Sequence, residues 1–145
     1  MAKTLTAANA TLMLSQAILF PNPQQIQGFS ADDVTDTDEI RRIETSMGVD
    51  GTLSGGFVFV PTMQRIVLQA DSPSISFFEA IDGQQQAAED VYTLSGSLYL
   101  PGTGKLYTMT KGFLTGVKPT PHVARIQQPQ TFRITWQSVL PTPTA

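Results

Sequence analysis

The feature that most constrains this fold is the polar stretch from Asp32 to Val60, which has two extended arms joined at Asp50-Gly51. An Asp-Gly pair between extended segments is a strong signal for a hairpin turn. The first arm has no purely apolar face, because charged and apolar residues share both phases of the alternation from Glu39 to Ser46. A hairpin that buries so little is marginal alone in water. We therefore expect a long projecting β-hairpin at about residues 36–60 that another subunit completes.

Alternation of apolar and polar residues with a period of two dominates the rest of the chain and predicts β-strands. The last strand shows it best, with Phe132, Ile134 and Trp136 facing inward. A length of 145 residues predicts a single domain over residues 1–145. Seven or eight strands with one helix predict a mainly β subunit, either a β-sandwich or an open barrel.

The alternation over residues 105–117 predicts one long strand. Uninterrupted alternation would place Met109 and Phe113 on the same face, together with Tyr107 and Val117. Gly112 and Gly116 fall on the other face, where a glycine indicates a bulge or the close approach of another group.

One short flanking helix is expected at about residues 73–82. Ser72 is a favourable N-cap, and Pro73 suits the first helical position. Ile75, Phe78 and Ile81 recur at a spacing of three and form one apolar face of the helix, which we expect to pack against the sheet. Gly83 is placed to end the helix, which leaves residues 84–90 as a loop.

The composition offers few residues for catalysis, and we do not expect an enzyme or a cofactor. The chain has no cysteine, which excludes disulfides and thiolate metal sites. A catalytic triad would have to use the single histidine, His122, which lies in a Pro-rich turn. The acids cluster in one polar loop, an arrangement that disfavours a glycosidase. Tyr99, Tyr107 and Trp136 are candidates for stacking on a sugar, although aromatic residues in strands more often serve packing.

A metal site and a membrane span are also disfavoured. Asp32, Asp36 and Asp38 suggest calcium ligands only loosely, because no glycine stands where an EF-hand loop needs one. No apolar run approaches about 18 residues, so no membrane insertion is expected. The first residues lack the continuous apolar segment of a signal peptide.

Charge is sparse and locally segregated. Asp32, Asp33, Asp36, Asp38 and Glu39 lie within eight residues, and Arg41-Arg42 follows. This block is either a solvated loop beside its counter-ions or an electrostatic docking surface. The net charge of −3 and the scattered basic residues disfavour a protein that reads nucleic-acid sequence.

The order of these features resembles the tail tube proteins of tailed bacteriophages, with the contractile-tailed type as the best match. The resemblance runs from about Gln24 to Val139. Its more specific parts are Gly28-Phe29 followed by Asp32-Asp33, and the helix start at Ser72-Pro73-Ser74. The long polar hairpin and the strand meander after the helix complete it.

The resemblance implies a structural virion protein that assembles in the host cytoplasm into hexameric rings and resides in the virion tail. The rings stack into a tube, and the long hairpin reaches into the neighbouring ring. Implied partners are further copies of the chain, a sheath, a tape-measure protein, baseplate proteins and double-stranded DNA passing through the channel. The charged residues of the hairpin region are then candidates for contacts between subunits or rings: Asp36, Asp38, Glu39, Arg41, Arg42, Glu44 and Asp50.

Two electrostatic expectations follow from a tube. Exposed ion pairs contribute only about 0–1 kcal/mol each, so rim charges set register more than strength. A net charge of −3 per subunit amounts to about −18 for six subunits, and an acidic channel would repel the phosphates of DNA.

Two alternatives remain open. The first is another virion β-protein, such as a tail terminator or decoration protein; a terminator would stop at one ring and would not polymerise. A sugar-binding β-sandwich would stay a monomer or small oligomer, and its glycan would quench Trp136 fluorescence.

Overall fold

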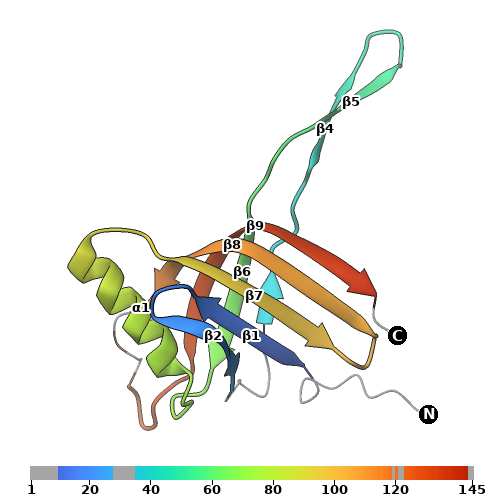
Figure 1. The fold of residues 1–145 in the computed structure, drawn as a ribbon. Helices are drawn as coiled ribbons and strands as arrows, with labels where there is room; N and C mark the ends of the chain where they lie inside the picture. Colours follow the sequence, from blue (N-terminus) through green and yellow to red (C-terminus); the bar gives the residue numbers. More distant parts are fainter. Residues whose placement is uncertain (1–9, 28–34, 119, 121–122, 144–145) are drawn as a thin grey trace.

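The computed structural model describes residues 10–27, 35–118, 120 and 123–143. Seven strands form one antiparallel sheet in the order β2-β1-β7-β8-β9-β6-β3, and β4 and β5 pair separately as a hairpin (Figure 1). The strands are β1 (Thr11–Gln16), β2 (Phe20–Ile26), β3 (Thr35–Thr37), β4 (Ile43–Met47), β5 (Leu53–Phe57), β6 (Thr62–Leu68), β7 (Thr93–Leu100), β8 (Lys105–Val117) and β9 (Gln130–Pro143), and the helix is α1 (Ile75–Ala88).

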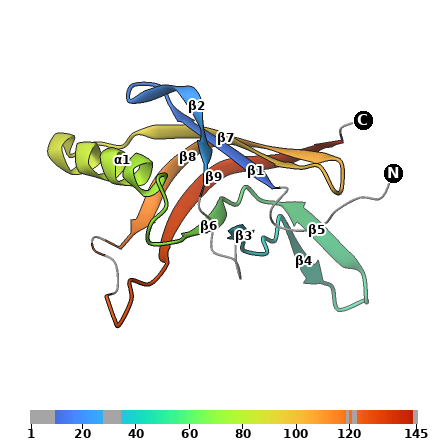
Figure 2. The ribbon, with the colours of Figure 1, turned by 90° about the horizontal axis from the view of Figure 1, so that it is seen from below.

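The prediction of a mainly β fold with one helix and a projecting hairpin is confirmed. The described strands form an open, curved sheet and do not close into a barrel. Figures 1 and 2 show α1 against one face of the sheet, and the β4–β5 hairpin extending away from the sheet on two long connecting segments.

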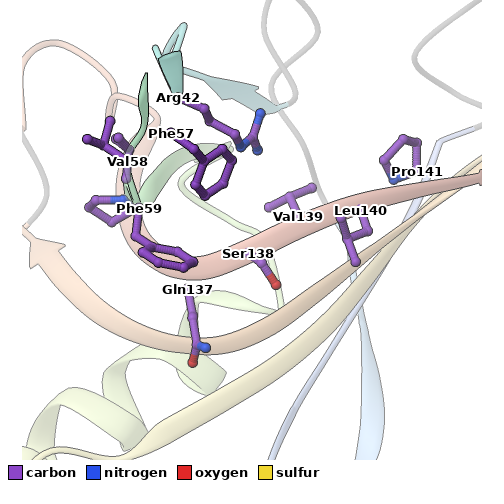
Figure 3. Close-up of a pocket in the computed structure, with 11 residues that line it drawn as sticks. Arg42, Phe57, Val58, Phe59, Gln137, Ser138, Val139, Leu140 and Pro141 are labelled. Carbon is purple, nitrogen blue, oxygen red and sulfur yellow. The ribbon is translucent and has the colours of Figure 1, made fainter. Parts of the chain in front are cut away.

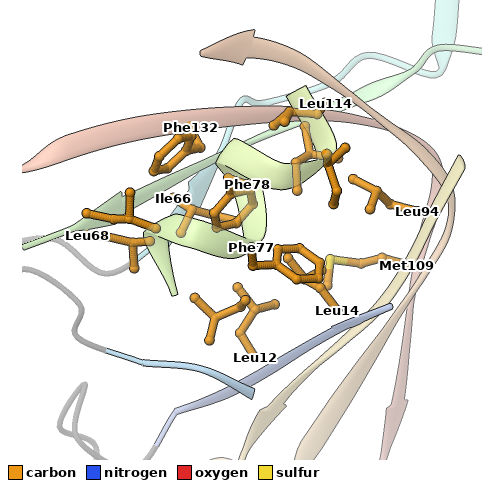
Figure 4. Close-up of a cluster of buried hydrophobic side chains, with 14 of the residues drawn as sticks. Leu12, Leu14, Ile66, Leu68, Phe77, Phe78, Leu94, Met109, Leu114 and Phe132 are labelled. Atoms are coloured by element: carbon orange, nitrogen blue, oxygen red, sulfur yellow. The ribbon is translucent and has the colours of Figure 1, made fainter. Parts of the chain in front are cut away.

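The core lies between α1 and the face of the sheet that α1 covers. Alternate residues of β1, β6 and β9 are buried there, as the period of two predicts. The ring of Phe78 stacks on Phe132 with centroids 4.5 Å apart (Figure 4). The rings of Phe77 and Phe20 are tilted against each other, with centroids 4.6 Å apart. The helix residues that face the sheet are Ile75, Phe77, Phe78 and Ile81.

The helix is longer than the expected 73–82. It continues through Gly83 to Ala88, and it ends where Glu89 adopts a left-handed conformation at φ 52°. Gly83 is therefore not the terminator, and the loop predicted for residues 84–90 is wrong. The physical reason is that residues 84–88, Gln-Gln-Gln-Ala-Ala, are good helix formers, so one glycine does not outweigh them.

The predicted N-cap is also displaced, from Ser72 to Ser74. The side chains of both serines are used to hold the segment that follows β2. Ser72 Oγ donates to the Gln27 carbonyl at 2.5 Å, and Ser74 Oγ accepts from the Gln27 N–H at 2.8 Å. The start of the helix is thus tied to the edge of the sheet.

A bulge in β8 changes which residues face the core. Lys111 adopts φ 48°, and the pairing of β8 with β7 shifts at this point. Met109 is buried before the bulge, whereas Gly112 and Leu114 are buried after it. Phe113 therefore does not share the face of Met109, because the extra residue reverses the alternation.

Candidate assembly surface

The projecting hairpin carries an apolar face that nothing in the described chain covers. β4 and β5 pair so that Ile43 lies opposite Phe57 and Met47 lies opposite Leu53. These four side chains are 55–64% exposed, and we call them the apolar stripe. Residues 36 and 37 belong to β3 in the main sheet, so the paired part of the hairpin is narrower than residues 36–60.

The turn of the hairpin is well formed. The Gly48 N–H donates to the Thr52 carbonyl at 2.8 Å, and Gly51 takes the left-handed φ of 85° that glycine permits. Asp50 Oδ1 accepts the Thr52 N–H at 3.0 Å. This backbone hydrogen bond, helped by one from the Thr52 side chain, lowers the pKa of Asp50. The turn is therefore held by both backbone and side-chain hydrogen bonds although it is exposed to solvent.

The charged residues predicted to make contacts are spread along the hairpin and its arms. Asp36 lies in β3, 3.9 Å from the Arg65 guanidinium. Asp38 and Glu39 follow on the first arm, and Glu44 lies in β4 on the face opposite the apolar stripe. Among the described residues, neither Arg41 nor Arg42 has a carboxylate within ion-pair distance. Within the described part of the chain, these two arginines therefore have no carboxylate partner.

A groove of about 610 Å³ lies where the hairpin joins the sheet (Figure 3). Phe57 and Phe59 form one wall, with their rings edge to face at 5.3 Å, and Phe59 is 94% exposed. Arg42 lies at one end of the groove. The opposite wall is the strand from Gln137 to Pro141.

That wall is also a free strand edge. β9 pairs with β6 only from Gln130 to Trp136, whereas it pairs with β8 as far as Pro143. In the described part of the chain, no strand therefore pairs with residues 137–142 on the side away from β8. An unpaired edge of this length is a template for a strand of another chain.

The apolar stripe was not predicted from the sequence, because the alternation within one arm does not show which residues of the other arm lie beside it. Within the first arm, Ile43 shares its phase with Arg41 and Glu39. The stripe exists only because the register of the hairpin sets Ile43 beside Phe57 and Met47 beside Leu53. The position of Asp50-Gly51 midway between these pairs was the available signal.

Other candidate sites are not supported where they are described. Trp136 is fully buried, so it cannot stack on a sugar. The ranges with assigned structure hold no group of three His, Cys, Asp or Glu side chains placed to bind a metal. No helix within them is long and apolar enough to cross a membrane. His122, Asp32, Asp33 and the Gly28-Phe29 motif lie outside the described residues.

Chains of known structure share this fold over nearly their whole length. A chain of the six-fold symmetrised cryo-EM structure of the anti-feeding prophage (AFP) baseplate superposes with a TM-score of 0.60 at 10% identity, covering 99% of this chain and 98% of that one. A chain of the extended PVC sheath-tube complex, an extracellular contractile injection system, gives 0.57 at 11% identity, covering 97% and 93%. A chain of the AFP tube terminating cap gives 0.58 at 10% identity, covering 99% and 94%.

In sequence, the family model described as "Tail fiber protein gp32" matches residues 3–140. No curated protein is significantly similar to the chain.

Proposed function

This chain belongs to the tail fiber protein gp32 family, and we propose that it is the structural subunit of the inner tail tube, which self-assembles into stacked rings. The observation that carries this proposal is the projecting hairpin with its uncovered apolar stripe. The proposed role in a tube is also supported by the shared fold with chains of a sheath-tube complex, a tube cap and a six-fold symmetrised baseplate.

Stacking of rings is the role we assign to the hairpin. Full burial of a large apolar side chain contributes about 1.5–3 kcal/mol. Since about three-fifths of each stripe residue is exposed, docking would recover roughly 1–2 kcal/mol per residue, or roughly 4–8 kcal/mol per hairpin before the cost of ordering. Six hairpins at one ring boundary would multiply this gain. The charged residues of the arm then select the register of the contact.

Closure of each ring is the role we assign to the free edge of β9. A strand of a neighbouring copy laid along residues 137–142 would pair the exposed backbone groups. The ring number of six is part of the proposal. Sheath, tape-measure and baseplate proteins are the further partners of such a tube, and DNA is its cargo. No step of this function requires catalysis.

Electron microscopy of the purified chain across a concentration series tests the proposal. We expect stacked rings or hollow tubes above a critical concentration, whereas compact monomers at every concentration would contradict self-assembly. Met47→Ser combined with Leu53→Ser removes half of the apolar stripe without disturbing the subunit, because both side chains are exposed. Tubes should then fail to grow.

The register of the hairpin provides a matched control. Ser46 and Ser54 are the adjacent cross-strand pair and lie on the other face. Ser46→Thr combined with Ser54→Thr should leave tube growth unchanged. Tubes of normal length from the Met47 and Leu53 variant, at an unchanged critical concentration, would refute the role of the apolar stripe.

The second candidate is a component that forms a single ring, such as a tail terminator, and the similarity to a chain of the AFP tube cap structure favours it. It predicts rings that never stack at any concentration. The same micrographs therefore separate the two functions.

A further inference from the structure

Charged side chains are segregated on the seven-stranded sheet. Its described strands carry the cations Arg65, Lys105, Lys111 and Arg133, but only one anion, Asp36. The other described acids lie on the hairpin and its arms (Asp38, Glu39, Glu44, Asp50) or around α1 (Asp71, Glu79, Asp82, Glu89, Asp90). The acidic net charge of the chain is therefore not a property of the sheet.

Two of these cations are cross-strand partners. Arg65 of β6 lies directly opposite Arg133 of β9. Both lie on the face turned away from α1, because the flanking residues of each strand are buried in the core. Like charges placed directly opposite each other destabilise a sheet. A pair kept in this arrangement needs anions nearby.

Among the described carboxylates, one lies near Arg65 and none lies near Arg133. Asp36 lies 3.9 Å from the Arg65 guanidinium. The Arg133 guanidinium lies 3.9 Å from the sulfur of Met63, and no carboxylate of the described residues is within ion-pair distance of it. The stem of Arg133 packs over Gly116, where an added Cβ would lie 3.0 Å from the Arg133 Cβ. Packing thus presents the charged head of Arg133 at the surface.

Two threonine hydroxyls lie beside Arg133 on the same face of the sheet. Thr115 and Thr135 share a hydrogen bond of 3.0 Å between their side-chain oxygens, on strands β8 and β9. Thr115 also donates to the Arg133 carbonyl at 3.4 Å. These bonds use the hydroxyl protons within the sheet, which leaves the exposed guanidinium of Arg133 as the donor group for phosphate oxygens on this face.

We propose that the face of the sheet opposite α1, centred on Arg133, contacts the phosphate backbone of duplex DNA without reading its sequence. This inference rests on the proposed tube, in which one face of the sheet lines the channel, and it assigns that face. Repeated around a ring, Arg133 would give a circle of weak phosphate contacts. Each contact is screened at physiological salt, so DNA is guided without being held.

The salt dependence of binding tests the proposal on unassembled subunits. The probe is a short fluorescein-labelled duplex, and the readout is anisotropy from about 20 mM to about 200 mM salt. Each phosphate contact contributes about 0.9 to the slope of log K against log salt concentration. Arg133→Gln should therefore weaken binding and lower the slope by about 0.9, whereas Arg133→Lys should retain it. Two unrelated duplex sequences should bind equally.

Arg125→Gln is the matched control, because Arg125 is exposed on the loop before β9, where it lines a hollow with residues 69–71. It should leave the slope unchanged. An unchanged slope for Arg133→Gln would overturn the proposal, and so would an equal loss for Arg125→Gln. Thermal unfolding checks that each variant is folded.

The outcomes separate this inference from the tube itself. Micrographs without rings would contradict the tube, and the duplex measurement on subunits would still stand. Tubes that form normally from subunits without affinity for the duplex would overturn this inference alone. Binding of an acidic peptide in place of the duplex would assign the face to a protein cargo and overturn the assignment to DNA.

Discussion

Gly112 occupies a position where even one methyl group has no room. An alanine Cβ there would lie 2.4 Å from Cε3 of the Trp136 indole and 2.5 Å from Cζ3. Trp136 is fully buried, and its Nε1–H donates to Oε1 of Gln64 at 2.9 Å. Gln64 is itself buried. Gly112→Ala must therefore move either the indole ring or the pairing of β8 with β9.

The cost has two parts. Overpacking of a closely packed core costs about 1–3 kcal/mol. Displacement of the indole from Gln64 would leave buried polar groups without their partners, which costs a further 1–3 kcal/mol or so, for a total of about 2–6 kcal/mol. A domain with a total stability of about 5–15 kcal/mol would lose a large fraction of it.

Urea unfolding followed by fluorescence measures this cost directly, because Trp136 is the only tryptophan in the chain. We expect a lower midpoint and a red-shifted native emission. Gly56→Ala is the control, since an added Cβ at Gly56 meets no atom within 4 Å. A Gly112→Ala protein with wild-type midpoint and emission would refute the packing argument.

Four further changes test other parts of the structure. Gly83→Ala should stabilise the protein by about 0.5–1 kcal/mol in urea unfolding, because Gly83 lies inside the helix and an added Cβ meets nothing; destabilisation would indicate that the helix ends there. Phe78→Asp should abolish cooperative unfolding monitored by circular dichroism, because a buried carboxylate would replace the ring that stacks on Phe132. The pKa of Asp50 is lowered in the folded turn, so its hydrogen bond to Thr52 should remain at pH 3.8, the ordinary pKa, and be lost only as the pH falls through the lower folded pKa. An NMR titration of the Thr52 amide with a midpoint at or above 3.8 would contradict this. Arg41→Glu combined with Arg42→Glu should leave circular dichroism unchanged but block tube growth in micrographs, and tubes of normal length would exclude these arginines from docking.

Local patterns determined the class of the fold. The period of two in β1, β6 and β9 predicted which side chains are buried, because alternate residues of a strand point to opposite faces. Asp50-Gly51 located the hairpin turn for a similar reason, since only a few residues tolerate a positive φ. The spacing of Ile75, Phe78 and Ile81 predicted the helix and its inner face.

The end of the helix and the position of the bulge in β8 were harder to predict from the sequence. From the sequence, Gly83 is compatible with the end of a helix or with its interior. The residues that follow it and the packing on the sheet decide where the helix ends. Gly112 indicated a bulge or a close approach in β8, and the structure has both, but the alternation did not show that the bulge falls at Lys111. It reverses the faces of the strand after that point and brings Gly112 against Trp136 of the neighbouring strand β9.

The sequence by itself determined that the chain is mainly β, that one helix covers its core, and that a polar hairpin projects from it. Only the tertiary structure decided what the surfaces present: the apolar stripe, the free edge of β9 and the paired arginines Arg65 and Arg133. All three depend on the register between strands, which the alternation within a single strand does not reveal. Periodicity shows which residues share a face of one strand, but it does not show which residues of another strand lie beside them.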